Sequence, residues 1–149
     1  MRKQNNMENF SRDINYSISI GENEAIVLIG TMKDRFHDIE IEVVVDADSL
    51  KILNNRVQFR KSPSPYCDRA EKQLQSLNGV VIGRGLSRQI MLATGGGEGC
   101  SNLRTLLTGL LPLALNVKAA EGFEEDEEML AAIRLKLTGS CVGYPVGED

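Results

Sequence analysis

The chain has 149 residues, a net charge of −4 and a pI of about 5.1; 42% of its residues are hydrophobic and 26% are charged. This length predicts a single domain over residues 1–149, which can bury a sizeable core without disulfides or a metal to staple it. The acidic balance and the absence of tryptophan argue against a nucleic-acid surface, which needs clustered basic and stacking side chains.

The polar N-terminal segment and the longest apolar run bear on localisation. Residues 1–9 lack the apolar core of a signal peptide, and we expect them, like residues 146–149, to be flexible. The run over residues 103–117 is too short and too interrupted to span a bilayer. We therefore expect a cytoplasmic protein without a membrane partner, which could bind another protein or a second copy of itself.

Alternation of apolar and polar residues predicts strands in the first half of the chain. Residues 10–20 alternate strictly, as in a half-buried strand, and residues 24–33 are apolar on both sides, as in a central strand. Residues 39–45 alternate again, and residues 50–60 predict a weaker strand that is broken near Asn54 and Asn55. The short connections between these segments favour an antiparallel meander.

Helices are predicted in the second half. One runs from Pro65 to about Leu77, and a second covers residues 86–94 and ends at a glycine run. A third starts near Cys100, and Pro112 should kink or end it. The last, over residues 124–138, has acidic first turns and a basic last turn, which complement the helix dipole.

These elements together predict an α+β fold, in which a three- to four-stranded antiparallel sheet packs against the C-terminal helices. Eight apolar residues that recur with the period of their element are expected in the core: Ile26, Leu28, Ile41, Val43, Leu74, Leu103, Leu107 and Ile133.

The three cysteines carry the clearest chemical signal. Their odd number prevents complete pairing within the chain, and a reducing compartment would keep them as free thiols or metal ligands. Cys67 and Cys100 are expected at helix starts, where the helix dipole favours a thiolate, and Cys141 follows the last helix. Free cysteine is also among the most buried residue types, so three packing thiols are the structural alternative.

Two further features are weaker candidates. The loop from Gly95 to Gly99 could cradle an anion, but it lacks the lysine of a P-loop, so a helix C-cap with a flexible turn is the simpler interpretation. His37 is the only histidine and lies beside Asp38 in the turn before the third strand. Either a solvated histidine or a ligand or base is compatible with that position.

Several segments in series resemble an uncharacterised bacterial family, a domain of unknown function with a Gly-Cys-Ser/Thr-x-Leu motif. The resemblance covers about residues 10–143 and is carried by His37-Asp38, by residues 45–52, by Pro65-Tyr66-Cys67, by residues 77–85 and by residues 95–103. Two positions depart from the family pattern: Asn102 and Val142 stand where histidines are usual. The family implies no activity, and these departures imply that any site using those histidines is altered here.

A more distant similarity is to U-type iron–sulfur scaffold proteins, which also place strands before helices and carry three cluster-ligating cysteines. The Gly99-Cys100 pair looks similar to the second of these cysteines, whereas the surroundings of Cys67 differ. This is a likeness of architecture, which does not fix function.

The sequence thus leads to three hypotheses. The first is an accessory protein in which Cys67, Cys100 and Cys141 bind a soft metal such as zinc or copper(I), or an iron–sulfur cluster, with His37 or Asp38 as a fourth ligand. The second is an enzyme that uses Cys100 as a nucleophile, assisted by His37. The third is an interaction module with buried structural cysteines.

Overall fold

The computed structural model describes residues 1–147, and the chain divides into two compact units, Met1–Leu115 and Asn116–Asp149. The single domain expected for the whole chain stays a prediction. The flexibility expected for residues 146–149 falls in part on residues 148 and 149, which lie outside the described residues. Within residues 1–147, no helix is both long and apolar enough to cross a membrane.

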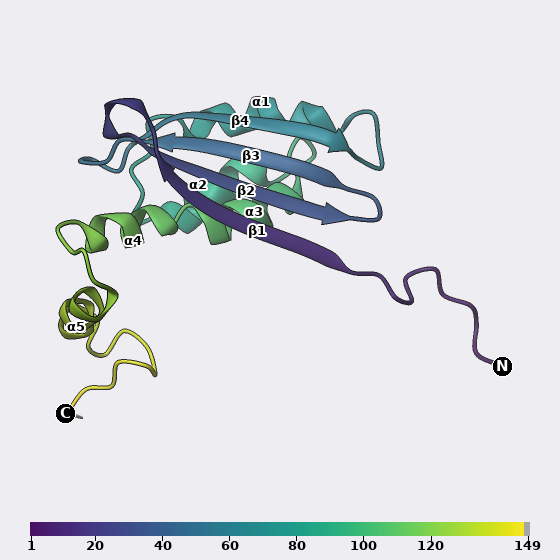
Figure 1. The fold of residues 1–149 in the computed structure, drawn as a ribbon. Coiled ribbons are helices and arrows are strands. Elements are labelled where there is room, and N and C mark those ends of the chain that lie inside the picture. Colours follow the sequence, from purple (N-terminus) through teal and green to yellow (C-terminus); the bar gives the residue numbers. More distant parts are fainter. Residues whose placement is uncertain (148–149) are drawn as a thin grey trace. The chain divides into compact units, whose positions relative to one another are not determined.

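The first unit contains a four-stranded antiparallel sheet, which confirms the predicted meander (Figure 1). Its strands follow in chain order as β1 (Arg12–Ile20), β2 (Ile26–Asp34), β3 (Asp38–Val45) and β4 (Ile52–Lys61). A short 3-10 turn, η1 (Glu22–Glu24), connects β1 with β2. Because the connections are short, each strand pairs with its neighbour in sequence.

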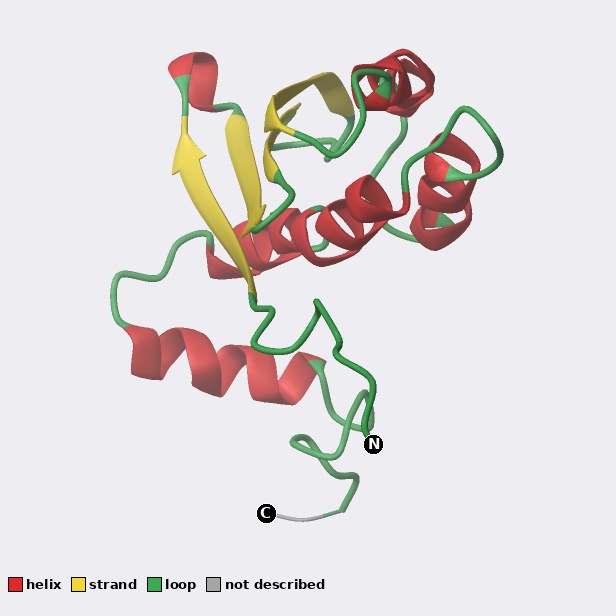
Figure 2. Ribbon diagram, turned by 90° about the vertical axis from the view of Figure 1, so that its right-hand side faces the viewer, coloured by secondary structure: helices red, strands yellow, loops and turns green. Residues whose placement is uncertain are grey.

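The helical elements follow the strands, which confirms the predicted α+β class. They are η2 (Cys67–Arg69), α1 (Ala70–Leu74), η3 (Gln75–Leu77), α2 (Leu86–Thr94), α3 (Ser101–Leu110), α4 (Leu113–Ala120) and α5 (Asp126–Lys136). Figures 1 and 2 show α1, α2 and α3 against one face of the sheet. Pro112 separates α3 from α4, as expected of a residue that cannot continue a helix.

The core lies between that face of the sheet and helices α1 to α3. Every second residue of β2 and β3 points into it, and the leucines of α3 fill it from the other side. Seven of the eight predicted core residues are buried: Ile26, Leu28, Ile41, Val43, Leu74, Leu103 and Leu107. The eighth prediction, Ile133, is wrong, because α5 lies in the small second unit and all of its residues, which are described in full, are at least partly exposed.

Strand β1 is more exposed than its alternation predicts. The side chains of Ile14, Ile18 and Ile20 are 40%, 41% and 59% exposed, because β1 is an edge strand that the helices only partly cover. Tyr16 is the exception: its hydroxyl donates to the Thr105 carbonyl at 3.2 Å, and burial raises its pKa. The edge strand is thus anchored to α3 at one point.

Strand β4 is continuous where a break near Asn54 and Asn55 was predicted. Asn55 is buried, and its amide donates to the Leu74 carbonyl at 3.0 Å and to Asn78 Oδ1 at 2.9 Å. A polar residue can therefore occupy a buried strand position, because its hydrogen bonds tie the sheet to the end of α1. The irregularity is a register shift against β3, where Val44 pairs with Asn54 and Val45 with Ile52.

Candidate functional site

The turn between β2 and β3 is built around the Asp34 carboxylate, whose side chain is fully buried. Asp34 Oδ1 accepts hydrogen bonds from the backbone N–H groups of Phe36 at 2.7 Å and His37 at 2.8 Å. Aspartate is well suited to such a turn, because its short side chain reaches the N–H groups two and three residues ahead. The turn thereby fixes the backbone from which the His37 side chain projects.

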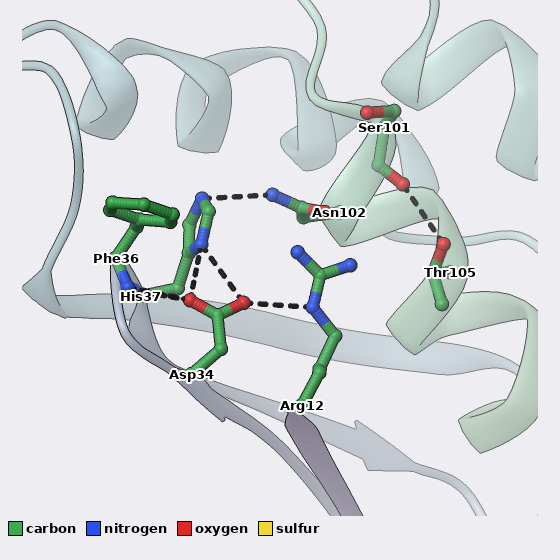
Figure 3. A network of polar contacts seen from close by, with 7 residues as sticks. All are labelled: Arg12, Asp34, Phe36, His37, Ser101, Asn102 and Thr105. Atoms are coloured by element: carbon green, nitrogen blue, oxygen red, sulfur yellow. Dashed lines mark hydrogen bonds and ion pairs between the residues drawn. The ribbon is translucent and has the colours of Figure 1, made fainter. Parts of the chain in front are cut away.

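The same carboxylate holds the His37 imidazole (Figure 3). His37 Nδ1 lies 2.9 Å from Asp34 Oδ1 and 3.1 Å from Asp34 Oδ2. Arg12, on β1, donates a hydrogen bond from Nε to Asp34 Oδ2 at 2.8 Å. On the other side of the ring, the Asn102 amide lies 3.1 Å from His37 Nε2. Since Nδ1 faces a carboxylate, it carries a proton that it donates to Asp34, and the Asn102 amide nitrogen faces Nε2 on the opposite side of the ring.

Asp34 is held in its ionised form. Burial by itself raises the pKa of the carboxyl, but the hydrogen bonds from His37, the Phe36 N–H and Arg12 outweigh it and hold that pKa well below its usual range. The arrangement therefore places a fixed negative charge behind His37, whose side chain is only 13% exposed. A carboxylate in this position orients an imidazole for proton transfer or for metal coordination through Nε2.

The N-terminal segment covers the outer side of this turn. The Phe10 ring stacks on Phe36 with centroids 6.1 Å apart, and Arg35 lies 4.7 Å from the Phe36 ring centroid. Arg35 also donates to the Asn6 carbonyl at 2.6 Å. These aromatic, cation–π and hydrogen-bond contacts attach the N-terminal segment to the turn.

A second feature is a pocket of about 390 Å³ between η2 and the start of α3. Two free thiols line it, Cys67 and Cys100, together with Tyr66, Arg69, Ala70, Ser101 and the loop residues 97–99. Cys100 is the N-cap residue of α3, and no side chain caps that helix. The predicted placement of Cys100 at a helix start is thus confirmed, and Cys67 lies at the first position of η2.

The loop from Gly95 to Gly99 determines where Cys100 lies. A Cβ atom on Gly99 would clash with the Thr94 carbonyl oxygen, so only glycine allows the chain to return this close to the end of α2. The loop therefore delivers Cys100 to the pocket. Asn102, in the first turn of α3, also connects this helix start to His37.

The other predicted site residues lie elsewhere. Cys141 is exposed and belongs to the second unit. Asp38 alternates with the buried Ile39 and so faces away from the helices; its Oδ1 is 3.8 Å from Arg60 Nη1, beyond hydrogen-bond reach. Among residues 1–147, no group of three or more His, Cys, Asp or Glu side chains could hold one metal ion. A site with three cysteines stays a prediction.

Sequence reasoning missed the partners that make His37 more than a solvated side chain. Asp34 stands three residues before His37, a spacing at which a turn aspartate can reach an imidazole, and this is the one signal that was available. Arg12 lies on β1, 22 positions before Asp34, and Asn102 lies 65 positions after His37. No local sequence pattern connects either residue to the turn.

Comparison with known proteins identifies a family to which the chain is similar. A family model described as Protein of unknown function (DUF2889) matches residues 12–116, which is more than half of the chain. The matched range contains Asp34, His37, Cys67 and Cys100 and ends where the second unit begins, before Cys141. No curated protein and no solved structure matches the chain. The chain therefore belongs to the family of proteins of unknown function DUF2889.

Proposed function

We propose that the protein binds a soft metal ion in the pocket between η2 and α3, with Cys67 and Cys100 as thiolate ligands. The observation that carries this proposal is that the two thiols lie 33 positions apart in the sequence, on separate elements, and line one pocket. Both are free and only partly exposed, which suits ligands that must be reached by an ion but shielded from bulk water.

The number of ligands favours copper(I). Thiolates select copper(I), zinc and iron–sulfur clusters, but structural zinc is almost always four-coordinate and clusters are usually held by four protein ligands. The pocket offers two sulfurs, and copper(I) is stable with two sulfur ligands. Zinc or a cluster would require Cys141 and a further ligand, such as His37, to join.

Metal titration of single-cysteine variants tests the proposal. We would titrate copper(I) under argon, against a competing chelator, into reduced wild-type protein and into Cys67→Ser, Cys100→Ser and Cys141→Ser. The wild type should bind one ion per chain. Cys67→Ser and Cys100→Ser should each weaken binding by more than about 100-fold, because the loss of an outer-shell partner alone costs about 10–100-fold.

Cys141→Ser is the matched control and should bind as the wild type does. An equal loss in all three variants would show that the second unit supplies a ligand, and zinc binding would then replace copper(I) as the better assignment. Weak, substoichiometric uptake by the wild type would leave Cys67 and Cys100 as packing residues and would refute the proposal.

A second candidate function rests on the Asp34–His37 pair. A carboxylate that fixes the Nδ1–H tautomer leaves Nε2 as a base, and such a base activates a nucleophile in cysteine and serine enzymes. Cys100 and Asn102 begin the same helix, so His37 Nε2 could serve Cys100 once the Asn102 amide turns away.

Alkylation kinetics distinguish this enzyme from a metal-binding protein. For a nucleophile, Cys100 in the metal-free protein should react with iodoacetamide faster than glutathione does, and His37→Gln should slow it. If Cys100 is alkylated no faster than glutathione, the enzyme candidate is excluded, and the result of the metal titration is unaffected.

A further inference from the structure

The two pocket thiols have a second property, which concerns oxidation. Cys67 and Cys100 are free, lie on separate elements and share a pocket lined by three consecutive loop residues, 97–99. We propose that a peroxide converts this pair into a disulfide and that the disulfide prevents metal binding in the pocket. The regulation of metal binding rests on the proposed function, whereas formation of the disulfide does not.

Cys100 is the thiol that meets the peroxide first. It occupies the N-cap position of α3, where a serine or threonine side chain would normally accept hydrogen bonds from the first-turn N–H groups. No side-chain hydrogen bond caps this helix, so the Cys100 sulfur is not engaged by those donors. The sulfur is therefore available to attack a peroxide from the pocket that it lines with Cys67.

The reaction has two balanced steps. In the first, the Cys100 thiolate attacks one peroxide oxygen; an S–O bond forms, the O–O bond breaks, and the leaving alkoxide or hydroxide takes a proton. In the second, the Cys67 thiolate attacks the sulfenic sulfur of Cys100; the S–S bond forms, the S–O bond breaks, and the leaving hydroxide takes the proton that the Cys67 thiol released, giving water. Two thiols lose two electrons in total, and the peroxide gains them.

The loop between α2 and α3 supplies the movement that bond formation requires. A disulfide holds its two Cα atoms about 4.4–6.8 Å apart, so η2 and the start of α3 must adopt that separation when the bond forms. Gly96 has a φ of +73°, and a Cβ on Gly96 or Gly97 would meet no atom within 4 Å. Gly96 and Gly97 thus lie in open space, whereas Gly99 packs against Thr94, so we place the movement at residues 96–98 and in η2.

Cys141 is the internal reference. It is exposed, lies in the second unit and follows α5 in the chain. A reagent that oxidised thiols by exposure alone would attack Cys141 in preference to the half-buried Cys67 and Cys100. Selective pairing of the pocket thiols would therefore come from their placement.

Peptide mapping tests the proposal with the full chain. Reduced, chelator-treated protein would receive one equivalent of hydrogen peroxide, followed by alkylation of the remaining thiols and tryptic digestion without reductant. The expected product links residues 62–69, which contain Cys67, to residues 89–104, which contain Cys100, and leaves Cys141 alkylated. Dithiothreitol should restore all three thiols.

Two variants give independent readouts. Cys67→Ser removes the resolving thiol, so Cys100 should accumulate as a sulfenic acid that dimedone labels at least about tenfold more than in the wild type. Cys141→Ser should form the disulfide as the wild type does. A wild type that keeps all thiols, links residues 137–149 to either peptide, or carries Cys100 directly to a sulfinic acid would overturn the proposal.

The outcome is separable from the metal-binding test, because the mapping uses no metal and the titration uses no oxidant. If the disulfide forms and abolishes copper(I) binding reversibly, the regulation is established. If the disulfide forms in a protein that binds no copper(I), the proposed function fails and the peroxide reaction stands alone.

Discussion

Replacing Asp34 should destabilise the first unit more than replacing any exposed carboxylate. Its buried side chain accepts hydrogen bonds from two backbone N–H groups, from the His37 ring and from Arg12, at 2.7–2.9 Å for the shortest contact of each. Asp34→Ala leaves all of these donors without an acceptor. Asp34→Asn keeps the shape and one acceptor oxygen but loses the charge.

The magnitude follows from the burial of each partner. Removing one member of a buried charged pair costs about 3–5 kcal/mol. Arg12 is 33% exposed and can return to water, so we expect Asp34→Ala to lie at the lower end of that range, near 3 kcal/mol. For Asp34→Asn we expect about 1–3 kcal/mol, the usual value for a hydrogen bond to a charged group.

The effect should depend on pH with a defined sign. Because the network holds the pKa of Asp34 below its unfolded value of about 3.9, the folded state binds fewer protons than the unfolded state in acid. The stabilisation is therefore fully present above that unfolded value and is lost as the pH falls toward the lower folded pKa. The difference between wild type and Asp34→Asn should be large at pH 7 and should shrink below about pH 4.

Urea denaturation followed by far-ultraviolet circular dichroism, repeated between pH 3 and pH 8, measures this difference. Asp13→Asn is the matched control, since Asp13 is an exposed carboxylate of β1, and it should change stability by less than about 0.5 kcal/mol. An Asp34→Asn protein as stable as this control, or a difference that grows toward acid, would refute the reasoning.

Three further predictions concern the core, the anchor of β1 and the imidazole. Leu107→Ala, at a fully buried position, should cost about 2–5 kcal/mol in urea denaturation, whereas Leu135→Ala, at a position 81% exposed, should cost less than about 0.5 kcal/mol. Gly109→Ala would place a Cβ against the Tyr16 ring and hydroxyl and should cost about 1–3 kcal/mol in the same assay. This cost should fall in the background of Tyr16→Ala, and additive effects in the double mutant would contradict the contact. Because His37 is the only histidine, a nitrogen-15 correlation spectrum at pH 7.5 should show a single imidazole protonated at Nδ1, and an Nε2–H signal would contradict the network.

The sequence determined the order and class of the elements. Alternation with a period of two located the strands, and short connections made them antiparallel. Pro112 ended α3, and the glycine run ended α2, because these residues limit the backbone wherever they occur. Such signals are local, so they need no knowledge of the packing.

The tertiary structure decided which side chains meet. The pairing of β1 with β2 brings Arg12 to Asp34, and the packing of α3 on the sheet brings Asn102 to His37. The glycine loop and η2 place Cys100 and Cys67 on one pocket. No periodic sequence pattern predicts these contacts, because each of them joins two distant segments through the geometry of the core. The exposure of β1 has the same origin: its alternation predicts an inner face, but only the placement of α3 decides how much of that face is covered.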